Sequence, residues 1–385
     1  MNEINSVGLA LDPTNVPSFL LDWELTKLCN LDCSYCATGI DGGHDNTTKH
    51  PDKNDCFKTI DFMYEYADLY MQYKKPSQRK VILNVYGGES LFHPDIVEIL
   101  EECRNRYQKY KNKWQLTITS TTNAVVGKNH WKRIVPLIDE FSLSYHPENL
   151  AKQKEQYKSN VLYLNEQGKN FKCIIMMHNN EKWFKDAESM IEFCIKNKLR
   201  YVIKPLDNQT DQWKYAPEQF LKLETIWANL IPNLKKDNHR KIINIHEEKM
   251  ISSIESGRSC CGGRKLSLNN DLKSCVSYVP KQGFRDWYCS VNWFFLFVQQ
   301  LTGNVYTNKD CRTSTTGQVE PLGNLSNYQF ILDKVKLQFD NKAMPVIKCV
   351  KDICICGFCA PKADNYDDFK ELLDRNLDKE KYYGN

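Results

Sequence analysis

The sequence predicts an α/β protein, a partial (β/α)6 TIM-like barrel followed by a smaller cysteine-rich α+β domain. Between residues 18 and 207, short apolar runs alternate six times with longer segments, most of them with helical periodicity, which indicates a parallel sheet with helical crossovers. From residue 257 onward the composition shifts to cysteine, glycine and aromatic residues in short strand-like runs. Because there are six units rather than eight, we expect an open barrel that binds ligands at the carboxyl ends of its strands.

The predicted strands and helices of the barrel follow each other in order. The first helix has apolar side chains at mostly helical spacing, and Pro94 stands at a favoured early position of the second. Gly168 ends the fourth helix. The strands are expected at residues 18–26, 80–86, 115–122, 141–145, 171–177 and 200–205, and the helices at 55–73, 94–110, 129–138, 150–167 and 182–198.

Five segments are expected along the chain. The segment after the barrel is charged and carries helical patches with two prolines, and the last residues are charged enough to indicate a helix with a frayed end. The segments are an N-terminal extension (1–17), the partial barrel (18–207), a helical linker (208–256), the cysteine-rich domain (257–362) and a charged C-terminal helix or tail (363–385).

The charge balance and the hydropathy pattern argue against two classes of protein. Lys+Arg number 52 and Asp+Glu 48, so the net charge of +4 gives no case for a dedicated nucleic-acid binder. No run approaches the ~20 apolar residues that span a bilayer. Residues 1–17 also lack the basic start and apolar core of a signal peptide. We therefore expect a cytoplasmic protein with no membrane partner and no evident nucleic-acid partner.

The 16 cysteines are unusual for a protein of the reducing cytoplasm, where clustered thiols indicate metal or redox chemistry rather than disulfides. Three of them lie between residues 29 and 36, and nine lie between residues 260 and 359. The remaining four stand among apolar neighbours and are expected to be ordinary buried side chains: Cys56, Cys103, Cys173 and Cys194.

Cys29, Cys33 and Cys36 directly follow the first predicted strand. Three thiolates in one short loop can wrap one face of an iron–sulfur cubane, whose complete ligand set is four. The remaining iron would be open for another ligand, as a catalytic site requires. The alternative is a structural zinc site that His44 or His50 completes.

The spacing Cys-x3-Cys-x-aromatic-Cys, with Tyr35 as the aromatic residue, resembles the signature of the radical S-adenosylmethionine (radical SAM) superfamily. The resemblance implies a partial βα barrel and a 4Fe–4S cluster held by the three cysteines. It also implies that S-adenosylmethionine (SAM) chelates the free iron. One electron then cleaves SAM to methionine and a 5′-deoxyadenosyl radical, which abstracts a hydrogen atom from the substrate.

Gly87, Gly88 and Glu89 end the second predicted strand. Two adjacent glycines permit a close backbone approach, and a simple turn at the end of a strand is the alternative. The radical SAM family carries a Gly-Gly-Glu motif at this position, which hydrogen-bonds the methionine amino group. The continuation Ser-Leu-Phe-His-Pro is also similar to that of the family.

Thr122 and Asn123 end the third strand, in a region that contacts the cofactor in the family. Ala124 stands where the family usually has glycine, and a turn-forming asparagine is the alternative for Asn123. Ser144 ends the fourth strand, where family members often place a polar residue near the ribose or carboxylate of SAM.

Two further side chains are weak candidates for catalysis. His146 follows the fourth strand and could accept a proton at the barrel mouth, although a structural or capping histidine is as plausible. Lys204, at the end of the sixth strand, could neutralise a carboxylate of the cofactor or substrate, although an exposed lysine is the commoner case.

The C-terminal cysteines resemble the SPASM/twitch extension of radical SAM enzymes, in which cysteines flank a hairpin and a later Cys-x2-Cys pair completes an auxiliary 4Fe–4S cluster. By that match the ligands of one auxiliary cluster are Cys289, Cys311, Cys356 and Cys359, with Cys354 as the main rival. A second cluster could use Cys260, Cys261, Cys275 or Cys349. A zinc ribbon is the alternative for the whole domain.

The resemblance implies an oxidoreductase that acts on a peptide or a small polar metabolite. It also implies an external one-electron reductant such as flavodoxin or ferredoxin. The auxiliary cluster would accept an electron or ligate the substrate. A different class stays open: a non-catalytic iron–sulfur electron carrier or a zinc-stabilised binding protein would need neither Gly87–Glu89 nor an open iron.

Overall fold

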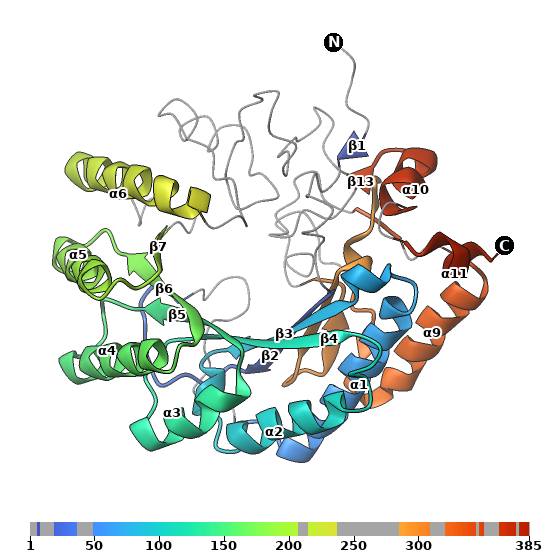
Figure 1. Cartoon of the computed structure of the whole chain (residues 1–385), viewed down its shortest axis with the longest axis horizontal. Helices are drawn as coiled ribbons and strands as arrows, with labels where there is room; N and C mark the ends of the chain where they lie inside the picture. The colour runs from blue at the N-terminus through green and yellow to red at the C-terminus, as the bar shows by residue number, and fades with distance from the viewer. Residues whose placement is uncertain are drawn as a thin grey trace, which may run out of the picture.

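The computed structural model describes residues 6–7, 19–36, 49–206, 215–236, 285–308, 320–343, 346–349, 362–374 and 377–384. Its main feature is a curved sheet with helices along its convex side (Figure 1). Among these residues the sheet has nine strands, in the order β11-β10-β9-β2-β3-β4-β5-β6-β7.

Six consecutive parallel strands form the barrel part of the sheet, and each pairs with the next along the chain. They are β2 (Phe19–Thr26), β3 (Lys80–Gly87), β4 (Gln115–Thr122), β5 (Glu140–Tyr145), β6 (Asn170–Met177) and β7 (Tyr201–Pro205). All six lie within one residue of the predicted strands. The predicted fold class, a partial α/β barrel with a small C-terminal domain, is confirmed.

The helices that connect these strands cover the outer face of the sheet (Figure 1). Alternate strand residues such as Leu21, Trp23 and Val85 point toward them and are fully buried. The core therefore lies between sheet and helices. The connecting helices are α1 (Lys53–Met71), α2 (Ile96–Tyr107), α3 (Lys128–Ile134), α4 (Ala151–Glu166) and α5 (Glu181–Lys196), and helix α6 (Pro217–Lys236) follows β7.

The free edge of β2 is covered by strands from the far end of the sequence. The buried strand β9 (Phe295–Gln299) pairs with β2 in parallel. Strand β10 (Asn304–Tyr306) then runs back antiparallel to β9 and pairs with β11 (Gly323–Asn324). The predicted hairpin is present, and it extends the barrel sheet, because an edge strand with unpaired backbone groups needs a partner.

A second, four-stranded sheet brings both ends of the chain together. Its order is β1 (Ser6–Val7), β13 (Lys362–Ala363), β8 (Tyr288–Cys289) and β12 (Ile347–Lys348). Helix α9 (Tyr328–Asp340) lies against α1, and α10 (Tyr366–Asp374) and α11 (Lys379–Tyr383) follow. None of the described helices is long and apolar enough to cross a membrane.

One buried side chain in this part of the fold lacks a polar partner. Lys74 is 1% exposed, and its Nζ lies 4.6 Å from the ring centroid of Phe294 with no hydrogen bond among the described residues. Burial lowers the pKa of Lys74 to about 7, because the apolar surroundings disfavour the charged form.

We expect Lys74→Met to raise the free energy of unfolding at pH 7 by about 2 kcal/mol, because it removes an unpaired buried amine and keeps the packing volume. Urea unfolding measures this change. Lys75→Met, at the exposed neighbouring position, is the control and should change stability by less than about 0.5 kcal/mol. A destabilised Lys74→Met protein would contradict the expectation.

Candidate functional site

The loop after β2 brings the three predicted cluster ligands together. Cys29, Cys33 and Cys36 are half-buried cysteines. The loop is ordered by its own backbone, since the Cys36 N–H donates to the Cys33 carbonyl oxygen at 3.0 Å. The N–H of Leu31 donates to Cys29 Sγ at 3.4 Å, which is favourable for a thiolate.

The electrostatics of this loop fit a cationic iron–sulfur group. Burial, together with the charges of the other two cysteines, raises the pKa of Cys33 to about 12. Burial likewise raises the pKa of Cys29 to about 11. Thiolates that raise each other's pKa need a positive partner, and a metal that coordinates a thiol deprotonates it outright. The donor set therefore suits the 4Fe–4S cluster that the sequence indicates.

A mononuclear metal site is not preformed here. Within the part of the chain that the structure describes, no three Cys, His, Asp or Glu side chains gather closely enough to hold one ion. The ligands of a cubane lie farther apart, because the cluster itself fills the space between them. Of the two zinc candidates, His44 lies outside the described residues, and His50 contacts Thr26 and His93.

Gly87 and Gly88 are needed because their backbone lies directly on the cysteine loop. The N–H of Gly88 donates to Thr26 O, and the N–H of Glu89 donates to Leu28 O, both at 2.7 Å. A Cβ at Gly87, whose φ is +154°, would lie 2.0 Å from Thr26 O, and one at Gly88 would lie 2.3 Å from Leu28 O. The pair therefore sets the distance between β3 and the loop that carries the cysteines.

The Glu89 side chain points into the protein. It is 1% exposed, and its carboxylate accepts hydrogen bonds from the Leu91 N–H (3.0 Å), the Thr122 hydroxyl (2.8 Å) and the Asn123 N–H (2.6 Å). Glu89 thus ties the end of β3 to the end of β4. Burial raises its pKa to about 7, and the three donors oppose that shift in part.

The pKa of Glu89 predicts a pH dependence. The folded protein holds this proton more tightly than the unfolded chain, whose value is near 4.5. Its contribution to the free energy of unfolding is therefore largest below pH 4.5 and falls by about 3 kcal/mol as the pH rises to 7. We expect Glu89→Gln to remove this slope in urea titrations of the metal-free protein. Equal slopes in both proteins would contradict it.

Asn123 forms a turn and also contacts the cysteine loop. Its Oδ1 accepts the N–H of Val125 at 2.9 Å, as in an Asx turn. Its Nδ2 donates to Asn30 Oδ1 at 2.8 Å and lies 3.8 Å from Cys29 Sγ. Asn123 therefore forms a turn and places its amide beside Cys29, and its contact with the cofactor stays a prediction.

Ala124 adopts the left-handed conformation that glycine would favour, with φ of +54°. That conformation costs an alanine about 1 kcal/mol. It is held by Asn160, whose Nδ2 donates to the carbonyl oxygens of Ala124 and Val126, both at 2.9 Å. Ala124 thus adopts the backbone conformation that a glycine would favour at this position.

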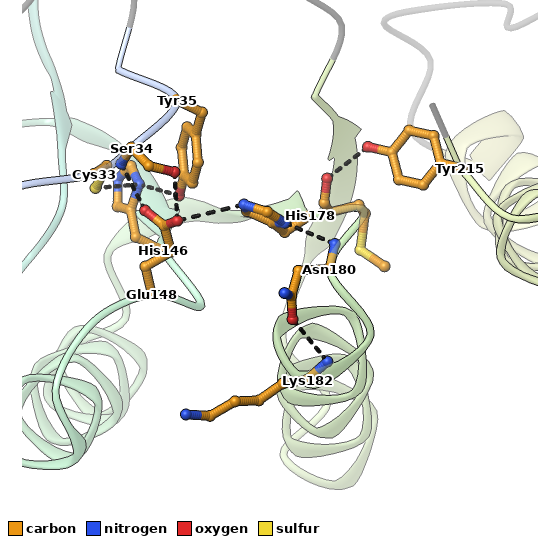
Figure 2. Close-up of polar contacts among 10 residues, drawn as sticks. Cys33, Ser34, Tyr35, His146, Glu148, His178, Asn180, Lys182 and Tyr215 are labelled. Carbon is orange, nitrogen blue, oxygen red and sulfur yellow. Dashed lines mark hydrogen bonds and ion pairs between the residues drawn. The ribbon is translucent and has the colours of Figure 1, made fainter. Parts of the chain in front are cut away.

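His146 and Tyr35 form a pair at the side of the loop (Figure 2). The Tyr35 hydroxyl and His146 Nδ1 form a hydrogen bond of 2.8 Å, and the rings stack with centroids 5.8 Å apart. The same nitrogen lies 3.4 Å from Cys33 Sγ. Burial, and then the charge of Lys204, lowers the pKa of His146 to about 4, so the ring is neutral at physiological pH.

The other two barrel candidates lie on neighbouring strands. Ser144 is half-buried on β5, two residues before His146 and on the same face of the strand. Lys204 is exposed on β7, and its charge reaches His146.

Two side chains in contact with this site were not singled out from the sequence. Glu148 accepts hydrogen bonds from the N–H and the hydroxyl of Ser34, at 2.7 and 2.5 Å. His178 Nε2 lies 3.3 Å from the Glu148 carboxylate (Figure 2). One signal was available, because His178 directly follows β6 as His146 follows β5.

Two C-terminal cysteines lie on one small sheet. Cys289 is buried on β8 opposite Ile347 of β12, and Cys349 follows that strand with its N–H bonded to Trp287 O at 2.8 Å. This register makes Cys289 and Cys349 diagonal neighbours on the same face. The other candidates lie outside the described residues: Cys260, Cys261, Cys275, Cys311, Cys354, Cys356 and Cys359.

No family model and no curated protein matches the chain. Among solved structures it is similar to native anSMEcpe with bound AdoMet, at 13% identity and a TM-score of 0.50, covering 93% of this chain and 97% of that one. Histidine-tagged anSMEcpe with bound AdoMet is 13% identical, with a TM-score of 0.50, and the match covers 93% of this chain and 93% of that one. Native anSMEcpe with AdoMet and the Cp18Cys peptide is 12% identical, with a TM-score of 0.48, and the match covers 93% of this chain and 96% of that one.

These structures of anSMEcpe hold bound AdoMet, and one of them also holds a peptide. The similarity to anSMEcpe extends over 93% of this chain and concerns its architecture. The chain therefore shares the fold of anSMEcpe, a partial α/β barrel with a small C-terminal domain.

Proposed function

We propose that this protein is a radical SAM enzyme that cleaves SAM reductively and abstracts a hydrogen atom from a peptide or a small polar metabolite. The observation that carries the proposal is the set of three half-buried cysteines, Cys29, Cys33 and Cys36, in the loop at the carboxyl end of β2. That loop is packed by Gly87 and Gly88 in the way their motif predicts.

In this proposal the three cysteines hold a 4Fe–4S cluster, which supplies the electron that cleaves SAM when both are bound. Asn123 holds Cys29 in place through its amide, and Tyr35 and His146 pack beside Cys33. The carboxylate of Glu89 is buried and already accepts three hydrogen bonds. We therefore assign the contact with the methionine amino group to the backbone carbonyls of this motif.

The inner face of the barrel supports a polar substrate. Asn84 donates to Asp22 at 2.6 Å and accepts from Thr119 at 3.3 Å, which links three neighbouring strands on that face. Ser142 and Ser144 continue it on β5. These half-buried hydroxyl and amide groups make that face polar, which suits the hydrogen-bonding groups of a peptide or a polar metabolite.

The C-terminal domain would hold at least one auxiliary 4Fe–4S cluster. We assign Cys289, Cys311, Cys356 and Cys359 to it, and the position of Cys349 beside Cys289 makes Cys349 the strongest alternate ligand. The cluster would accept an electron from the substrate, which makes the enzyme an oxidoreductase, or ligate the substrate. A cytoplasmic flavodoxin or ferredoxin would supply the first electron.

The test uses the full chain, purified and reconstituted without oxygen. Iron and sulfide analysis with visible absorption comes first, because a zinc protein would carry neither. The loaded protein is then incubated with dithionite and SAM. Formation of 5′-deoxyadenosine is the expected result. A fully loaded protein that makes none is an electron carrier, and the proposal fails.

A further inference from the structure

The carboxylate of Glu148 forms hydrogen bonds with the cysteine loop. Glu148, in the connection after β5, has a side chain that is only 9% exposed. Its Oε2 accepts the Ser34 N–H at 2.7 Å, and its Oε1 accepts the Ser34 hydroxyl at 2.5 Å. Ser34 directly follows Cys33, so this contact acts on the middle of the cysteine motif (Figure 2).

The ring of His178 lies against the carboxylate of Glu148. The Asn180 N–H donates to His178 Nδ1 at 2.8 Å, so the neutral ring carries its proton on Nε2, which faces Glu148 at 3.3 Å. The ring of Trp183 packs edge-on against His178, with centroids 4.6 Å apart. Because both oxygens of Glu148 accept hydrogen bonds from Ser34, the arrangement suits an ionised carboxylate.

We propose that Glu148 is a positioning residue that fixes the cysteine loop through Ser34 and lowers the reduction potential of the cluster bound there. This inference rests on the proposed function. A negative charge beside a cluster disfavours the addition of an electron, and hydrogen bonds to cluster sulfurs also tune its potential. The Ser34 N–H donates its hydrogen bond to Glu148, so it does not donate one to a sulfur atom of the cluster.

Two substitutions separate the positioning from the charge. Glu148→Ala removes both hydrogen bonds to Ser34. Glu148→Gln keeps an oxygen and an amide of the same shape but removes the charge. Glu181→Gln is the matched control, because Glu181 is an exposed carboxylate on α5, away from the loop, and pairs with Lys185 at 2.7 Å.

Hydrogen exchange in the metal-free full chain tests the positioning without any cofactor. We expect the Ser34 amide to exchange at least about tenfold faster in Glu148→Ala than in the wild type, because its acceptor is gone. Glu148→Gln and Glu181→Gln should exchange nearly as the wild type does. Unchanged exchange in Glu148→Ala overturns the positioning role, whatever the activity of the protein.

A redox titration of the reconstituted holoprotein, followed by electron paramagnetic resonance, tests the charge. The signal that responds to SAM reports the barrel cluster separately from any auxiliary cluster. We expect Glu148→Gln to favour reduction about tenfold, a positive shift of about 59 mV for one electron. Equal potentials in Glu148→Gln and the wild type overturn the charge role. A wild type with no signal that responds to SAM refutes the proposed function and this charge role, while exchange still decides the positioning.

Discussion

Cys33→Ala should abolish the formation of 5′-deoxyadenosine from SAM. Cys33 is the central thiol of the loop, and removing it leaves two protein ligands for a cluster that needs three. Loss of partners outside the ligand shell already costs 10- to 100-fold, so we expect a loss of at least about a hundredfold. The measurement is chromatographic detection of 5′-deoxyadenosine after incubation with dithionite and SAM.

Cys56→Ala is the matched control for this change. Cys56 is fully buried on α1, outside the cysteine loop, and burial keeps its thiol protonated. The variant should lose some stability through a small cavity but keep its iron content and its product. A Cys33→Ala protein that still makes 5′-deoxyadenosine at the wild-type rate would refute the cluster assignment.

Gly88→Ala should cost about 4 kcal/mol or more of unfolding free energy and prevent cluster assembly. The added Cβ would lie 2.3 Å from Leu28 O and 2.4 Å from Lys27 O. Both atoms belong to backbone rather than to a flexible side chain, so β3 and the cysteine loop must move apart. Urea unfolding of the metal-free protein gives the energy, and the iron content after reconstitution reports the loop.

Gly127→Ala separates this clash from the general effect of replacing a glycine. A Cβ at Gly127 would meet no atom within 4 Å. Gly127 precedes α3 as its N-cap, where alanine is a poorer residue, so the cost should stay below about 1 kcal/mol. If Gly88→Ala cost no more than Gly127→Ala, the close approach of β3 to the loop would be wrong.

The barrel could be predicted from the sequence because its elements are encoded locally. The apolar run at residues 80–86 places β3, and helical spacing places α1, each within two residues of the observed ends. The cysteine motif is equally local, since its three thiols lie within eight residues. The strands and helices of the barrel, and the presence of three thiols in this loop, can therefore be predicted from residues that are close together in the chain.

The contacts that hold the cysteine loop could not be predicted from local sequence patterns. Glu148 meets Ser34 across 114 residues, and Asn123 meets Cys29 across 94. The strand β9 joins β2 although about 275 residues separate them. No periodicity within either segment specifies such a partner, because pairing depends on how the whole sheet closes.

For Glu89, the sequence motif and the tertiary structure each supply part of the description. Its motif marked the end of β3 as a functional position, but only the structure turned its carboxylate inward, onto the donors at the end of β4. The sequence by itself determined the strands, the helices and the three clustered thiols, because these depend on spacing along the chain. The tertiary structure alone decided which side chains hold those thiols, because that depends on groups brought together when the barrel folds.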